Sequence, residues 1–214
     1  MQFTVERPFG RHGCNPELYQ GNGLKQFVRT AEEAGLGAIA FTEHPAPSLK
    51  WLEQGGHASF DPLAALAFCA AATTRLRLLT YLLVLPYRNP LLMAKTVATV
   101  DQLSGGRLTI GAGSGYLRSE FAAMGVEFEE RGALLEEALD VLRQVWAGES
   151  FTGEGRHFTA PRQVSVPGPV QRPHPRCGWA GTAATSVVGS RVPRRDGRRC
   201  WSAKRLRGRP GPRS

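Results

Sequence analysis

The feature that most limits the fold is a repeated order of aliphatic run and amphipathic helix between residues 24 and 146. The aliphatic runs, with the length and composition of buried strands, occupy residues 36–42, 76–84 and 108–111, after a shorter candidate at 3–5. The helical segments occupy residues 24–34, 61–72, 91–103 and 131–146. Strands that alternate with helices pair in parallel through right-handed crossovers. The sequence therefore predicts an α/β fold with four βα units, either part of a (β/α)8 barrel or a doubly wound sheet.

Local signals mark the ends of these helices. Asp61-Pro62 and Asn89-Pro90 each combine an N-cap residue with proline at the first helical position. Gly35 stands where a C-cap glycine belongs. After residue 146, a hairpin is predicted around Gly153-Glu154-Gly155, followed by an extended, proline-rich segment up to Pro175.

The composition excludes several classes of protein. No apolar run approaches the roughly 18 residues that a membrane span requires, so no membrane association is expected. The N-terminus lacks the basic-then-apolar layout of a signal peptide, which favours a cytoplasmic protein. The four cysteines are widely spaced and form no CxxC pair, so we expect no metal site.

The net charge of +9 is concentrated at the C-terminal end. Residues 173–214 hold eleven of the 27 Lys and Arg but only one of the 18 acids, so residues 1–172 are nearly neutral. Beyond Pro175 the only branched aliphatic residues are Val187, Val188, Val192 and Leu206. Such a segment buries too little apolar area to offset its ordering entropy. We therefore predict a folded domain over 1–175 and a disordered basic tail over 176–214.

Two interpretations of this tail follow from its composition. The abrupt gain of Arg, Gly and Pro is typical of GC-rich coding DNA translated out of frame, which suggests a frameshift or truncation near Pro175. Alternatively, the arginines, with Trp179 and Trp201, would contact nucleic acid. Because the bases show no helical periodicity, we expect no specific nucleic-acid binding.

Polar residues interrupt the aliphatic runs where chemistry could occur. Glu43-His44 ends the run at 36–42, and a histidine there can exchange a proton near neutral pH, although a surface loop pair is the alternative. Thr80-Tyr81 lies inside the run at 76–84, where a buried tyrosine with a satisfied hydroxyl is the simplest interpretation. The glycines of 111–115 follow the fourth strand, not the first, which argues against a dinucleotide fingerprint.

The order and spacing of several segments together resemble the bacterial luciferase-like monooxygenases, and most closely the branch that uses the deazaflavin coenzyme F420. The segments are Ala34–Ala38, Thr42–His44, Leu83–Pro90, Ala94-Lys95, Ala98–Arg107 and Gly111–Tyr116, with Glu120 four residues on.

The resemblance implies a (β/α)8 TIM barrel in which an F420- or FMN-dependent oxidoreductase transfers hydride or activates oxygen on a small organic molecule. It implies that Glu43 and His44 are catalytic, next to the reactive ring. It also implies a bulge in the third strand, often with a non-proline cis peptide, at Thr80-Tyr81, where these two residues would back the cofactor ring. Gly113 and Tyr116 would contact the same cofactor after the fourth strand.

The chain also departs from the family pattern, because the late strands that hold the coenzyme phosphate in this fold have no counterpart here. The alternative to an active enzyme is therefore a half-barrel remnant without tight cofactor binding. Such a half-barrel would expose two edge strands with unpaired backbone groups, and a homodimer is one way to cover them.

Overall fold

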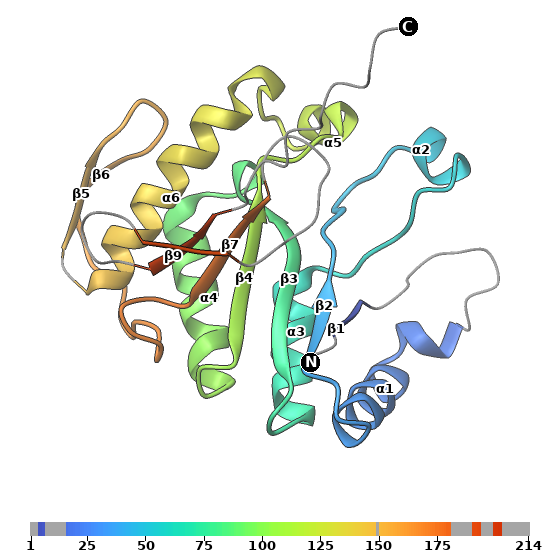
Figure 1. Ribbon diagram of the computed structural model, residues 1–214. Helices are drawn as coiled ribbons and strands as arrows, with labels where there is room; N and C mark the ends of the chain where they lie inside the picture. The colour runs from blue at the N-terminus through green and yellow to red at the C-terminus, as the bar shows by residue number, and fades with distance from the viewer. Residues whose placement is uncertain (1–3, 7–15, 149, 181–189, 194–198, 203–214) are drawn as a thin grey trace, which may run out of the picture.

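A parallel sheet of five strands forms the centre of the molecule (Figure 1). The computed structural model describes residues 4–6, 16–148, 150–180, 190–193 and 199–202. The strands follow the order β1 (Thr4–Glu6), β2 (Ala38–Phe41), β3 (Arg77–Val84), β4 (Leu108–Gly113) and β7 (Arg176–Ala180). Every neighbouring pair is parallel. The predicted βα order is therefore confirmed, in the form of part of a (β/α)8 barrel.

The long helices pack on one face of this sheet (Figure 1). They are α1 (Gly21–Glu33), α3 (Pro62–Ala72), α4 (Pro90–Leu103) and α6 (Arg131–Ala147). Short elements complete the connections: η1 (Pro16–Tyr19), α2 (Leu49–Glu53), η2 (Leu85–Tyr87), α5 (Arg118–Ala123) and η3 (Phe128–Glu130). In the part of the chain that the structure describes, no helix has the length and apolarity to cross a membrane.

The predicted helix starts are confirmed at the level of single hydrogen bonds. The carboxylate of Asp61 accepts the N–H of Ala64 at 2.9 Å, and Asn89 Oδ1 accepts the N–H of Leu91 at 2.9 Å. Each cap satisfies a backbone donor that has no partner within the helix. Gly35, just after α1, has φ +77°, the left-handed conformation expected of a C-cap glycine.

Side chains alternate between the two faces of the sheet. Leu78, Leu108 and Ile110 face the helices and are almost fully buried. Arg77 and Thr109 belong to the opposite face, which we call the inner face, and are only half-buried; an Arg77 Nη atom donates to Thr109 Oγ1 at 2.7 Å. The hydrophobic core therefore lies between the sheet and the helices, while the inner face carries both polar residues and the small or aliphatic Ala38, Ala40 and Leu79.

The predicted hairpin after residue 146 is confirmed, because β5 (Phe151–Glu154) and β6 (Thr159–Gln163) pair antiparallel. The start of the predicted tail is different. The segment Arg176–Ala180 was placed outside the folded domain, but it forms β7 and pairs with β4 along its whole length. Within the rest of the predicted tail, β8 (Ser190–Pro193) and β9 (Arg199–Ser202) form an antiparallel pair. The remainder of that prediction lies outside the described residues.

The loop that leads into β7 is fixed by a buried carboxylate on α4. Asp101 is fully buried, and its two oxygens accept the backbone N–H of Gln171 at 3.0 Å and the Gln171 side-chain amide at 2.7 Å. The same amide nitrogen donates to the carbonyl of Leu108 at the start of β4. Polar bonds therefore fix the chain just before β7, a strand that contains no branched aliphatic residue.

β3 and β4 are joined across an irregularity that the family resemblance implied. Their register shifts between Thr80 and Leu83, and the Tyr81–Leu82 peptide is cis. Thr80 is fully buried; its hydroxyl donates to the carbonyl of Gly111 at 2.8 Å and accepts the Gly111 N–H at 2.9 Å. A Cβ on Gly111 would lie 2.3 Å from the carbonyl oxygen of Thr80, so this close approach requires glycine.

A second polar contact fixes the entry to β3. The carboxylate of Glu32, near the end of α1, accepts the N–H groups of Thr74, Arg75 and Leu76 at 3.0, 2.6 and 2.8 Å. Burial acts to raise the pKa of Glu32, but these N–H groups and the charge of Arg75 outweigh it and hold the pKa below its usual value. The interaction therefore favours the ionised carboxylate.

We predict that Gly111→Ala destabilises the protein by about 1 to 3 kcal/mol, because the added methyl group collides with backbone that cannot yield cheaply. Gly132→Ala is the matched control: a Cβ there meets nothing within 4 Å, and alanine in a helix should stabilise by about 0.5 to 1 kcal/mol. Urea denaturation measures both free energies of unfolding. Equal effects of the two variants would contradict the need for glycine at residue 111.

We predict that Glu32→Gln lowers the free energy of unfolding by about 1 to 2 kcal/mol at pH 7, since charge-assisted bonds to three N–H groups are weakened. Because the folded pKa is depressed, this contribution is complete above the unfolded value of about 4.3 and is lost as the pH falls through the folded value. The difference between wild type and variant should therefore shrink below about pH 4. Glu33→Gln, on the exposed neighbour, is the control.

Candidate active site

Four of the residues selected from the sequence, Glu43, His44, Gly113 and Tyr116, lie at or just beyond the carboxyl ends of β2 and β4, whereas Thr80 and Tyr81 lie within β3. Glu43 and His44 follow β2, and Gly113 is the last residue of β4. The short helices α2 and α5 lie beyond this same end of the sheet, at the top of Figure 1. Active sites of barrel folds are built at this end, so the location agrees with the prediction.

His44 lies at the centre of a cluster of rings. Its side chain is only 8% exposed. The ring centroids of Trp51, His57 and Tyr116 lie 4.6, 4.9 and 6.0 Å from that of His44. Trp51 belongs to α2, so the long connection between β2 and α3 forms one wall of the cluster. No hydrogen bond joins His44 Nε2 to another of the described residues.

The carboxylate partner of His44 is Glu120, on α5. Glu120 Oε2 lies 3.2 Å from His44 Nδ1, and the side chain of Glu120 is almost fully buried. Glu120 Oε1 accepts the backbone N–H of Ala46 at 3.3 Å, and Oε2 accepts the hydroxyl of Tyr87 at 3.4 Å. From the sequence, Glu120 stands out only as part of the family resemblance, with no role of its own. Because 76 residues separate it from His44, no local pattern connects the two.

Glu43 makes different contacts from its neighbour. Its buried carboxylate accepts the N–H of Val84 at 2.5 Å and binds the guanidinium of Arg88, with Nε at 3.0 Å. Burial raises the pKa of Glu43, and Arg88 with the Val84 N–H opposes that rise. Arg88 also contacts Asp61 at 2.5 Å. These bonds tie Glu43 to the end of β3; its catalytic role stays a prediction.

His57 supports the ring cluster from the loop after α2. Its Nε2 lies 3.3 Å from the hydroxyl of Thr42, at the end of β2. Burial, and then the nearby His44, lower the pKa of His57, with Glu120 acting in the opposite direction. Its ring stands nearly perpendicular to that of His44, at 88°. His57 is not among the site residues predicted from the sequence.

The four residues predicted to bind cofactor differ in exposure. Thr80 is fully buried and its hydroxyl is engaged with Gly111, whereas Tyr81 is the exposed residue of β3, at 38%. Gly113 pairs with Val84 and is buried. Tyr116 is 64% exposed, and its pKa is raised by burial of its hydroxyl and by Glu120. Tyr81 and Tyr116 are therefore the two of the four whose side chains a ligand can reach.

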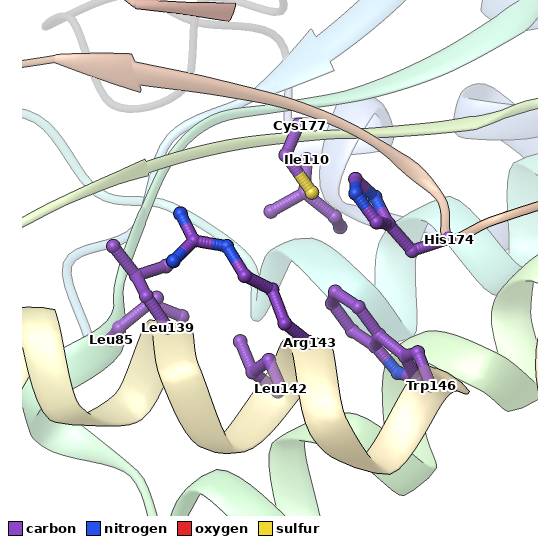
Figure 2. Close-up of a pocket in the computed structure, with 8 residues that line it drawn as sticks. All are labelled: Leu85, Ile110, Leu139, Leu142, Arg143, Trp146, His174 and Cys177. Atoms are coloured by element: carbon purple, nitrogen blue, oxygen red, sulfur yellow. The ribbon is translucent and has the colours of Figure 1, made fainter. Parts of the chain in front are cut away.

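One enclosed cavity lies away from these residues, between α6 and the sheet. Figure 2 shows Ile110 of β4 and Cys177 of β7 facing α6, with Trp146 and His174 nearby. The cavity measures about 10 Å³, at the lower limit for one water molecule. It is a packing gap in the core and is too small for a substrate.

Comparisons with known proteins identify the family of this chain. The model of the family described as luciferase-like monooxygenase matches residues 8–191. The F420-dependent glucose-6-phosphate dehydrogenase of Kribbella flavida is 35% identical over 149 residues, which are 68% of this chain and 43% of that protein. The FMNH(2)-dependent dimethylsulfone monooxygenase of Pseudomonas putida is 35% identical over 126 residues, 57% of this chain and 34% of that protein.

A solved structure gives the same result. The crystal structure of monooxygenase RslO1 from Streptomyces bottropensis superposes with a TM-score of 0.74 and 29% identity, over 84% of this chain and 53% of that chain. The chain thus spans about half the length of the relatives it matches. With the family model matching most of its residues, the chain belongs to the luciferase-like monooxygenases, a family of F420- and FMN-dependent oxidoreductases.

Proposed function

We propose that this chain is an oxidoreductase that uses coenzyme F420 on a small organic substrate, with His44 as the group that moves the proton. The observation that carries this proposal is the state of the imidazole. It is held at Nδ1 by a buried carboxylate, is flanked by aromatic rings, and has Nε2 without a partner among the described residues. A positioned histidine of this kind is the most frequent general acid or base in enzymes.

The residues at this end of the sheet fit a flavin-type ring, which offers a flat apolar face and a hydrogen-bonding edge. Tyr81 and Tyr116 supply exposed aromatic surface, and His44 Nε2 supplies a hydrogen-bonding group. Gly111 and Gly113 in β4 leave the strand without side chains there. These residues would hold the ring. Arg88 is engaged with Glu43 and Asp61, so it does not offer a free cation to a phosphate.

The division of labour follows from these contacts. A bound deazaflavin would supply a two-electron acceptor or donor of hydride, which no amino-acid side chain provides. His44 Nε2 would take a proton from a substrate hydroxyl or return one to it. Trp51 and His57 would keep water away from that nitrogen, because their rings pack against the imidazole.

The choice of F420 over FMN rests on the relatives. The F420-dependent dehydrogenase aligns with 68% of this chain, and the FMNH(2)-dependent monooxygenase with 57%. FMN is the alternative cofactor, and oxygen activation is the alternative chemistry. In both cases the role of His44 is proton transfer.

A second candidate is a partial barrel that binds no cofactor tightly. The supporting observation is that the described sheet has five strands, and no further described strand pairs with β1 or β7, whereas a closed barrel of this class has eight strands. Unpaired edge strands favour association with another chain, and we propose a homodimer as the form in which such a partial barrel would persist.

We predict that the purified chain quenches F420 fluorescence with a Kd in the micromolar range or below, and binds FMN at least tenfold more weakly. Fluorescence titration with each cofactor measures both constants. Tighter binding of FMN would reverse the choice of cofactor. If neither cofactor binds below about 1 mM, equivalent to less than about 4 kcal/mol of binding free energy, the partial-barrel alternative is correct.

We predict that His44→Ala lowers kcat by about 10²- to 10⁴-fold, the usual contribution of a general acid or base, and changes the cofactor Kd by less than about threefold. Turnover would be followed by the absorbance of F420 with a panel of alcohols, sugar phosphates and sulfones. His157→Gln is the control, because His157 lies on the β5–β6 side of the molecule and contacts Glu130 and Glu137. Unchanged kcat in His44→Ala would remove the proposed role.

A further inference from the structure

Among the described residues, the carboxylate of Glu120 meets two hydrogen-bond donors and one imidazole nitrogen. Its two oxygens face the N–H of Ala46, the hydroxyl of Tyr87 and Nδ1 of His44, and the carboxyl group is almost fully buried. A carboxylate can only accept hydrogen bonds, so this set of neighbours suits the ionised form. Burial of such a charge is tolerated where it is fully hydrogen-bonded, as it is here.

This arrangement restricts the state of the histidine. A nitrogen that faces a carboxylate must carry the proton, so His44 Nδ1 donates to Glu120. In the neutral ring the other nitrogen, Nε2, is then the acceptor. We propose that Glu120 is a positioning residue that holds neutral His44 in the Nδ1–H tautomer and so makes Nε2 the proton acceptor of the site. The tautomer of His44 does not depend on the proposed function. Only the use of Nε2 as the proton acceptor in catalysis rests on it.

The neighbouring rings fix the orientation that Glu120 selects. Trp51 packs at a tilt of 38° against one side of the imidazole, and His57 stands against it at 88°. The backbone of His44 is also held, because its N–H donates to the hydroxyl of Ser59 at 2.8 Å. The ring therefore has little freedom to turn over and present Nδ1 to the ligand side.

An amide cannot replace the carboxylate at residue 120. If the oxygen of Glu120→Gln takes the Oε2 position, its NH₂ faces the N–H of Ala46. If the oxygen takes the Oε1 position, the NH₂ faces His44 Nδ1 and the hydroxyl of Tyr87. The first orientation sets the NH₂ against the backbone N–H of Ala46, which cannot change its role. The second sets the NH₂ against Nδ1–H of His44, and this conflict ends when the proton of His44 moves to Nε2, while the hydroxyl of Tyr87 can turn to accept. The isosteric substitution therefore changes the tautomer with little change in volume.

The chain offers a matched histidine–carboxylate pair outside the site. His157 Nδ1 lies 2.8 Å from Glu137 Oε2, and His157 Nε2 lies 3.3 Å from Glu130 Oε2. Glu137→Gln removes a carboxylate from a histidine in the same way as Glu120→Gln, but leaves every contact of His44 unchanged. It is the control for any general effect of the substitution.

The test is nitrogen NMR of the full chain labelled with ¹⁵N-histidine, without cofactor, at a pH where the rings are neutral. The chain has five histidines, and the signals of His44 are those absent from His44→Gln. Long-range proton–nitrogen correlations distinguish protonated from unprotonated ring nitrogens. The wild type should show His44 protonated at Nδ1 and unprotonated at Nε2. An Nε2–H tautomer in the wild type overturns the proposal without any variant.

In Glu120→Gln, the Nε2–H tautomer of His44 should gain population at least tenfold, while Glu137→Gln should leave it unchanged. In turnover assays, Glu120→Gln should lower kcat by about ten- to ten-thousandfold, because a histidine in the wrong tautomer cannot accept a proton at Nε2, with KM nearly constant. An unaltered tautomer in folded Glu120→Gln rejects the positioning role. Failure of the proposed function would instead appear as unchanged kcat in His44→Ala, whatever the tautomer.

Discussion

The pairing of β3 with β4 is the constraint on which the rest of the site depends. The register of the two strands changes between Thr80 and Leu83, and the hydroxyl of Thr80 bridges the change by bonding both backbone groups of Gly111. Beyond the bulge, pairing resumes up to Val84 and Gly113. Because Val84 donates to Glu43, and α5 follows Gly113, the position of both site carboxylates follows from this one strand pair.

The two buried carboxylates of the site are stabilised in different ways. Glu43 faces a guanidinium, so its charge is balanced by the opposite charge of Arg88. Glu120 faces neutral donors and an imidazole, so its charge is stabilised mainly by hydrogen bonds. A carboxylate already bound to arginine adds rigidity and has little capacity to influence a proton elsewhere. A carboxylate that faces only donors keeps that capacity, and it is the one that contacts His44.

Whether a feature can be predicted from the sequence depends on how far apart in the chain the interacting residues are. The helix starts at Asp61 and Asn89 can be predicted because an N-cap side chain hydrogen-bonds to the first turn of its own helix. The position of His44 at a strand end is readable for the same reason. Its partner Glu120 is not, because two strands and three α-helices lie between the two residues in the chain. β7 is not predicted from the sequence because it contains no branched aliphatic residue, and the bonds that place it come from Asp101, far away in the sequence.

The anchoring of Gln171 on Asp101 has a consequence for the strand that follows. The docking point lies five residues before β7, so the register of β7 against β4 is set upstream of the strand itself. Once the backbone enters in register with β4, the backbone hydrogen bonds between the two strands can continue along β7. These bonds use N–H and C=O groups that every residue except proline provides. The residues that determine the register of β7 therefore lie before this strand in the sequence. The exposed Arg176 is correspondingly free to change while the sheet retains its fifth strand, whereas Cys177, buried in the core opposite α6, is not.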